Sequence, residues 1–150
     1  VINLGFSGNA LLDMEIAELM ASVDDPGLYV LDYVPNASAD AIDQVGEHFF
    51  RRIRDAHPEV PVVFIEDVIF PHTIFDNKIL EEVTKKNVAQ KRLFKKLKQS
   101  GEKRIYYISA EGMIGDDGEA TVDAIHFTDL GAMRYVDHVL PLIKRALRCH

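Results

Sequence analysis

Short apolar segments alternate along this chain with longer segments in which apolar residues recur every three or four positions. The short segments are rich in Val, Ile, Leu and Tyr, as buried strands are, and the longer ones have the period of amphipathic helices. The alternation predicts an α/β fold, with a parallel sheet and helices on both of its faces. The predicted strands are residues 1–5, 28–34, 60–65 and 104–109, and the predicted helices are residues 11–23, 38–57, 76–99 and 128–147.

Polar and turn-forming residues mark the ends of the predicted helices. Ser38 or Asp40 can cap the second helix and Thr128 the last, because these side chains accept hydrogen bonds from the first free N–H groups. Pro58 stops the second helix, and Gly101 follows the third. The predicted buried stripes are Ile42, Val45, Phe49 and Ile53 in the second helix and Ile79, Leu80, Val83, Leu93, Phe94 and Leu97 in the third.

Composition and charge narrow the classes of function. The 150 residues fit one domain, residues 1–150, and 47% apolar with 27% charged residues is the balance of a soluble globular protein. The net charge of −7 disfavours nucleic acid as a partner, because there is no basic excess to neutralise phosphates. No apolar run reaches the roughly 18–20 residues that a membrane span needs. Cys149 is the only cysteine, so an internal disulfide is excluded.

Residues suited to acyl-transfer chemistry follow the predicted strands. In parallel sheets ligands bind beyond the carboxyl ends of the strands, so these positions are expected to meet at one edge. The sharpest pair is Asp123 and His126, just ahead of the last helix: a carboxylate can hold one ring nitrogen of a histidine while the other accepts a proton. The N–H of Gly8 and the side-chain amide of Asn36 can donate to an oxyanion. Taken singly, each of these residues also fits an ordinary turn or loop.

These motifs, in this order, resemble those of the SGNH or GDSL-type hydrolases, an esterase and lipase family. Residues 3–9 (NLGFSGN) resemble the second block of the family, residues 34–37 (VPNA) the third, and residues 123–126 (DAIH) the fourth. The resemblance implies a three-layer α/β/α, flavodoxin-like fold without cofactor or metal. It also implies that His126 is the general base, that Asp123 orients it, and that Gly8 and Asn36 form the oxyanion hole.

The first family block, a Gly-Asp-Ser motif that carries the nucleophile, has no counterpart in the 150 residues. The third block also lacks its leading Gly and its trailing Asp, where Val34 and Ala37 stand. We therefore expect the first strand of the family fold, its serine and the following helix to be missing, and the missing strand to lie between residues 1–5 and 28–34. Either a fragment of a longer protein or a closed-up sheet would result. Ser7, beside Gly8, is the best internal candidate for a nucleophile, although the family gives its position no such role.

The resemblance implies a serine esterase or acylhydrolase that acts on carboxylic esters, and bacterial members make acetyl esters of carbohydrates a plausible substrate. The alternative is a non-catalytic α/β binding module, or an inactive remnant, which the absent serine favours. The sequence assigns no compartment and no oligomeric state.

Four further features have simpler explanations. Residues 116–119 (DDGE) fail the spacing of a calcium loop and are expected to form a solvated turn. The carboxylates of Glu66 and Asp67 allow phosphate or metal chemistry, but no glycine-rich phosphate loop accompanies them. His72 fits a surface loop better than a substrate contact. A solvated face, rather than an anionic partner, is expected for the basic residues Lys85, Lys86, Lys91, Arg92, Lys95, Lys96 and Lys98.

Overall fold

Three parallel strands form the centre of the protein. The computed structural model describes residues 1–148, so Cys149 lies outside it. The strands are β1 (Tyr29–Leu31), β2 (Val62–Ile65) and β3 (Ile105–Ile108), in the order β1-β2-β3. Tyr29 is aligned with Val62, and Val62 with Ile105. The predicted parallel α/β sheet is confirmed, with strands shorter than the apolar runs that predicted them.

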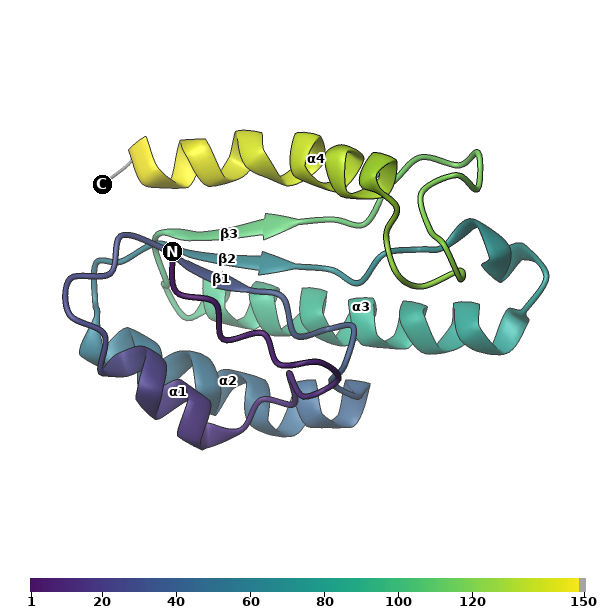
Figure 1. Ribbon diagram of the computed structural model, residues 1–150. Coiled ribbons are helices and arrows are strands. Elements are labelled where there is room, and N and C mark those ends of the chain that lie inside the picture. The colour runs from purple at the N-terminus through teal and green to yellow at the C-terminus, as the bar shows by residue number, and fades with distance from the viewer. Residues whose placement is uncertain (149–150) are drawn as a thin grey trace.

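Helices cover both faces of the sheet, which gives three layers (Figure 1). Helices α1 (Met14–Ala21), α2 (Ala39–Ala56) and α3 (Asn77–Gln99) lie on one side. Helix α4 (Asp129–Arg148) lies alone on the other side, and a short 3-10 helix, η1 (Pro71–Ile74), precedes α3. Among the described residues, no helix combines the length and the apolar character that a membrane-spanning segment needs.

The central strand β2 is buried on both faces and joins two apolar clusters. Its side chains alternate: Val62 and Phe64 pack toward α2 and α3, whereas Val63 and Ile65 pack toward α4. This is why the β2 sequence is continuously apolar instead of alternating with polar residues. The two clusters fix the three strands, and therefore the loops that leave their carboxyl ends.

Side-chain caps set the starts of α2 and α3. The Ser38 hydroxyl accepts from the N–H of Ala41 at 3.1 Å, so Ser38 is the cap of α2 and not Asp40. The carboxylate of Asp76 accepts from the N–H groups of Lys78 and Ile79 at the start of α3. In the predicted α3 stripe Val83, Leu93 and Leu97 are buried, and Leu80 and Phe94 are partly buried. Ile79 is 38% exposed because the first turns of α3 extend past the ends of the strands (Figure 1).

Residues 1–5 were predicted as a strand, and this prediction is wrong. They form no ladder with β1, and the N–H of Gly5 donates at 2.8 Å to the side chain of Asn3 instead of to another strand. An apolar run becomes a strand only where a neighbouring edge supplies hydrogen-bond partners. The segment still runs alongside β1, in the direction of the strands (Figure 1). The sheet has therefore not closed up between residues 1–5 and β1.

Candidate active site

The loops that carry the candidate residues leave the carboxyl ends of the strands, which all point the same way (Figure 1). Asn36 lies in the loop between β1 and α2, and Glu66 and Asp67 directly follow β2. The pair Asp123 and His126 lies in the long loop between β3 and α4. The topology therefore brings these loops to one edge of the sheet, as expected for a ligand site in a parallel α/β fold.

Asp123 and His126 form a hydrogen-bonded pair. Nδ1 of His126 lies 2.7 Å from Oδ2 of Asp123, while Oδ1 accepts from the backbone N–H groups of His126 at 2.8 Å and Ile125 at 3.1 Å. One short turn thus fixes both the carboxylate and the ring. The exposed imidazole keeps Nε2 available for a proton, which is the arrangement that a general base requires.

The turn also determines the charge of the pair. The backbone N–H of His126, the His126 ring and the N–H of Ile125 lower the pKa of Asp123 to about 2. The carboxylate is therefore ionised throughout the neutral range and accepts hydrogen bonds only. Ala124, between the two residues, has a φ of 72°, a left-handed conformation that folds the turn back on itself.

Contacts at both ends hold the loop that carries the pair. Beside the turn, Thr121 and Phe127 form an isolated antiparallel bridge, and the hydroxyl of Thr128 donates to the carbonyl of Glu119 at 2.9 Å. At the other end, Arg134 of α4 makes two hydrogen bonds to Asp117, of 2.7 and 2.6 Å.

Arg134 also donates to the carbonyl of Ile114 at 3.1 Å, and its guanidinium group keeps the pKa of Asp117 well below its usual range. Asp117 belongs to residues 116–119, which resemble a cation loop, and its carboxylate thus binds an arginine instead.

The two proposed oxyanion donors occupy turns. The N–H groups of Asn36 and Ala37 both donate to the carbonyl of Tyr33, at 3.0 and 2.9 Å, and no hydrogen bond engages the side-chain amide of Asn36 within the described part of the chain. Gly8 has a φ of 69° in a turn closed by a hydrogen bond from Asn9 to Phe6. A glycine takes this conformation without strain. Both donors are thus free to bind a ligand.

Of the two carboxylates after β2, that of Glu66 is hydrogen-bonded within the protein and that of Asp67 is buried. Glu66 accepts from the hydroxyl of Tyr107 at 2.6 Å and from the N–H of Ala110 at 2.8 Å, which ties the end of β2 to the end of β3. Burial raises the pKa of Asp67 to about 6. Across residues 1–148, no cluster of three or more His, Cys, Asp or Glu side chains could hold a metal ion.

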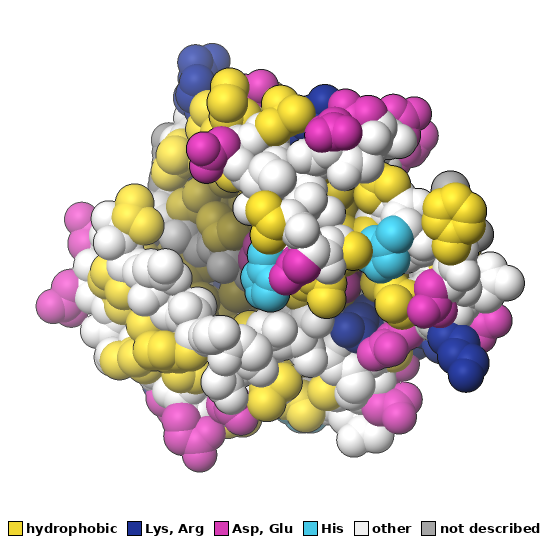
Figure 2. All heavy atoms as spheres, turned by 45° about the vertical axis from the view of Figure 1, so that its right-hand side comes forward, with side chains coloured by type: hydrophobic (Ala, Val, Ile, Leu, Met, Phe, Trp, Pro, Cys, Tyr) yellow, Lys and Arg dark blue, Asp and Glu magenta, His cyan; other side chains and the backbone are white. Residues whose placement is uncertain are grey.

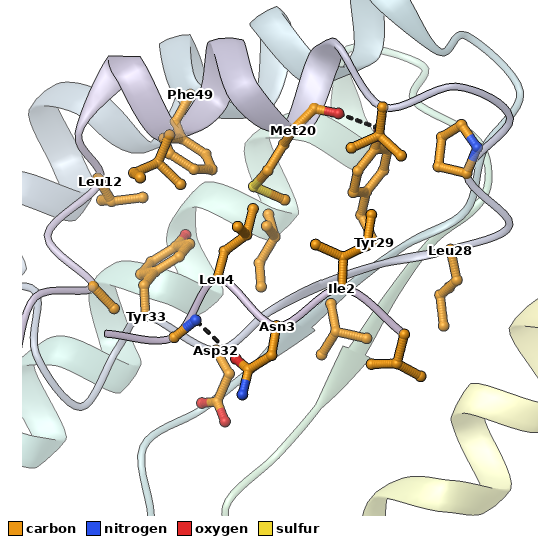
Figure 3. A pocket seen from close by; sticks show the side chains of 18 of the residues that line it. Ile2, Asn3, Leu4, Leu12, Met20, Leu28, Tyr29, Asp32, Tyr33 and Phe49 are labelled. Carbon is orange, nitrogen blue, oxygen red and sulfur yellow. Dashed lines mark hydrogen bonds between the residues drawn. The ribbon is translucent and has the colours of Figure 1, made fainter. Parts of the chain in front are cut away.

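A groove of about 790 Å³ runs along the outer edge of β1. Its walls are residues 1–5, α1 and β1 itself, and Figure 3 shows Leu4, Met20 and Tyr29 around it. Asp32 and Tyr33 lie at the end where β1 stops. The surface is hollowed in Figure 2, with hydrophobic side chains in the wall of the hollow. The groove separates the two segments between which we expected the missing strand.

The serines of the described chain do not complete a triad. No hydrogen bond joins Nε2 of His126 to a serine within residues 1–148. The hydroxyls of Ser22, Ser38 and Ser100 are bound to backbone groups of their own helices. Ser7 lies exposed in the turn beside Gly8, where its carbonyl accepts from Asn9.

Sequence reasoning missed three residues that hold the site loops. Arg134 anchors the loop of His126, Lys86 donates to the carbonyl of Pro35 at 3.2 Å, and Asn87 pairs with both backbone groups of Asp67 at 2.8 Å. Each contact joins a helix to a loop far away in the sequence, so no local pattern signals it.

The other features have ordinary surroundings. Part of the basic face of α3 is paired with α2, through Arg92 with Asp43 and Lys96 with Glu47. His72 lies in η1, with its ring centre 5.7 Å from that of Phe70. Neither arrangement identifies a binding partner.

Comparisons with known proteins agree with this architecture. A profile of the GDSL-like lipase/acylhydrolase family matches residues 1–144. A crystal structure from Bacteroides ovatus, of a protein named as a GDSL-like lipase, superposes with a TM-score of 0.93 at 33% identity, over 98% of this chain and 43% of that one. The salicylyl-acyltransferase of a tetracycline biosynthetic pathway shares the fold, with a TM-score of 0.65 at 16% identity over 87% of this chain and 42% of that one. No functionally curated protein matches the sequence.

Proposed function

The chain belongs to the GDSL-like lipase/acylhydrolase family, and on this premise we propose that its Asp123–His126 pair serves a serine esterase or acylhydrolase that cleaves carboxylic esters. The observation that carries the proposal is the 2.7 Å contact between Nδ1 of His126 and Asp123, which leaves Nε2 free as a base. The chain spans 43% of the Bacteroides protein, so the proposed activity belongs to the polypeptide that contains these residues.

The proposed reaction has two halves. A serine hydroxyl attacks the ester carbonyl while Nε2 of His126 takes its proton, and the oxyanion accepts hydrogen bonds from the Gly8 N–H and the Asn36 amide. The protonated imidazole then gives the proton to the departing alkoxide, which leaves an acyl-serine and a free alcohol. In the second half a water molecule, deprotonated by His126, releases the acid and restores the serine. Asp123 stays ionised throughout and holds the ring.

The groove beside β1 indicates where the segment that carries the serine could bind. The outer edge of β1 has no ladder partner among residues 1–148, and the groove wall is largely apolar. We propose that a parallel strand from outside these 150 residues fills the groove and completes the domain. The loop after that strand would carry the serine, at the same edge of the sheet as His126, because parallel strands end together.

The substrate class within the esters is a finer proposal. Acetyl esters of carbohydrates are consistent with the family resemblance of the sequence. The exposed setting of Asp123 and His126, whose side chains are 51% and 77% exposed, supports access for a bulky alcohol part.

The test compares this chain with a longer polypeptide that carries the residues preceding it in its source protein. We expect the longer protein to be labelled by a fluorophosphonate probe and to hydrolyse p-nitrophenyl acetate, and H126A to reduce the rate about 10³-fold or more. The 150-residue chain alone should be inactive. If the longer protein is neither labelled nor active, the esterase proposal fails, and the non-catalytic binding module becomes the better interpretation. Labelling of the short chain that S7A abolishes would instead identify Ser7 as the nucleophile.

A further inference from the structure

Lys86 of α3 is unusually enclosed for a lysine. Its side chain is 12% exposed, whereas that of its neighbour Lys85 is 72% exposed. Both follow a glutamate by four residues, Glu81 and Glu82, so helix position alone does not explain the difference. Lysines are rarely enclosed unless their ammonium group has a partner. Lys86 therefore has a specific contact in the fold.

Besides the exposed carboxylate of Glu82, which lies 3.7 Å away, the ammonium group contacts the peptide group that leads into Asn36. The ammonium Nζ of Lys86 donates to the carbonyl oxygen of Pro35 at 3.2 Å. The same planar peptide group carries the N–H of Asn36, which donates to the carbonyl of Tyr33 at 3.0 Å. Hydrogen bonds thus fix both the carbonyl and the N–H of the Pro35–Asn36 peptide group. The side chain of Asn36 remains free to rotate.

The same turn of α3 also reaches the loop after β2. Asn87 binds the N–H and the carbonyl of Asp67, and the positive charge of Lys86 opposes the rise that burial causes in the pKa of Asp67. The carboxylates of Asp32 and Glu82 raise that pKa further. One turn of α3 therefore contacts the loops that follow both β1 and β2, and Lys86 supplies its positive charge.

We propose that Lys86 is a positioning residue that holds the Pro35–Asn36 peptide so that the Asn36 amide points at the developing oxyanion. The inference rests on the proposed oxyanion role of Asn36. A charge-assisted hydrogen bond in an enclosed site orients a group more firmly than a neutral one. A misplaced oxyanion donor lowers the rate of the chemical step more than it weakens binding, because the oxyanion exists only in the transition state.

The test uses Lys86→Met, with Lys85→Met as the matched control and Lys86→Arg as the conservative variant. In the longer polypeptide that carries the serine, K86M should lower kcat about tenfold with little change in KM, K85M should leave both unchanged, and K86R should recover most of the loss. If Lys86 had only a structural role, K86M would lower the midpoint of urea unfolding but would not lower kcat selectively over KM. An equal effect of K85M and K86M would overturn the proposal.

A second measurement on the 150-residue chain does not depend on esterase activity. In NMR spectra, K86M should shift the backbone amide resonance of Asn36 and raise the pH at which the Asp67 carboxylate titrates, and K85M should do neither. If the longer polypeptide proves inactive but these shifts occur, the esterase proposal fails while the contact of Lys86 stands. Unchanged Asn36 and Asp67 resonances in K86M would refute the positioning role, whatever the activity.

Discussion

The contact between Asp123 and His126 depends on a turn of four residues and not on the sheet. The carboxylate is held by two backbone N–H groups of that turn, and the ring is held by the carboxylate. Each group in this chain of contacts fixes the next. The local sequence therefore contains the whole pair, which explains why a four-residue motif could predict it.

Asp123→Asn should separate orientation from folding. The remaining side-chain oxygen can still accept from the backbone of the turn, but the amide group no longer holds the Nδ1–H tautomer of His126. We expect a fall in esterase kcat of about 10³–10⁴-fold in the serine-bearing polypeptide, with only a small fall in the urea midpoint, because the ionised carboxylate stabilises an exposed turn and not the core. In the 150-residue chain, two-bond ¹H–¹⁵N spectra should show a smaller share of the Nδ1–H tautomer. Asp116→Asn, a carboxylate in the same loop, should leave both measurements as in the parent protein.

Asp67 should make stability depend on pH. Burial raises its pKa from 3.8 to about 6, so between these values the folded chain binds more protons than the unfolded chain. The free energy of unfolding therefore falls as pH rises through this window and levels off above it, by up to roughly 3 kcal/mol. Asp67→Asn should flatten this part of the profile in urea titrations from pH 4 to pH 7. The exposed Asp24→Asn should keep the parent slope; a D67N profile as steep as the parent's would contradict the assignment.

At the scale of elements, helices were easier to predict than strands. The stripe of α2 and the predicted caps Ser38 and Thr128 place their helices within a few residues, because capping and periodicity act locally. Residues 1–5 show the limit for strands, since a strand exists only with a partner. Candidate residues for the site followed from the order of the motifs. The contacts of Lys86 and Arg134 did not, because they form only after the chain has folded.

Arg134 should stabilise the loop between β3 and α4 more than it stabilises the whole fold. Arg134→Met removes the two hydrogen bonds to Asp117 and the one to Ile114. We expect faster amide hydrogen exchange across residues 111–127, with a loss of about 1 kcal/mol or less in global stability because the pair is partly solvated. Arg92→Met, which breaks the comparable pair with Asp43 between α2 and α3, should not change exchange in that loop. Equal exchange in the two variants would show that other contacts hold the loop.

The first turn of α4 packs closely against the loop between β3 and α4 at Gly131. A Cβ atom at this position would lie 1.9 Å from the carbonyl oxygen of Ala120, whose place is also fixed by a hydrogen bond from Thr128. Gly131→Ala must therefore displace the loop or the first turn of α4. We expect a loss of at least about 2 kcal/mol in urea unfolding, as for other overpacked sites. Gly27→Ala serves as the control, because this glycine also lacks a positive φ and an added Cβ would meet its nearest atom at an ordinary 3.9 Å.

For the molecule as a whole, stability comes from the two apolar clusters that β2 joins. Leu97 is fully buried in the cluster beneath the sheet. Leu97→Ala should cost about 2–5 kcal/mol in the free energy of unfolding, because it leaves a cavity that rigid neighbours fill only in part. Leu19→Ala, on the exposed face of α1, should change it by about 0.5 kcal/mol or less. A similar loss in both variants would contradict the assignment of the core.

The open edge of β1 should also make separate copies of the chain associate. An unpaired strand edge is a template for any extended segment, and Val30 on this strand is 41% exposed. A segment tethered in the same polypeptide would compete for the edge at an effective concentration of millimolar order, far above that of free protein in dilute solution. Light scattering of the 150-residue chain should therefore show association that grows with protein concentration. A version with its own strand in the groove should stay dispersed.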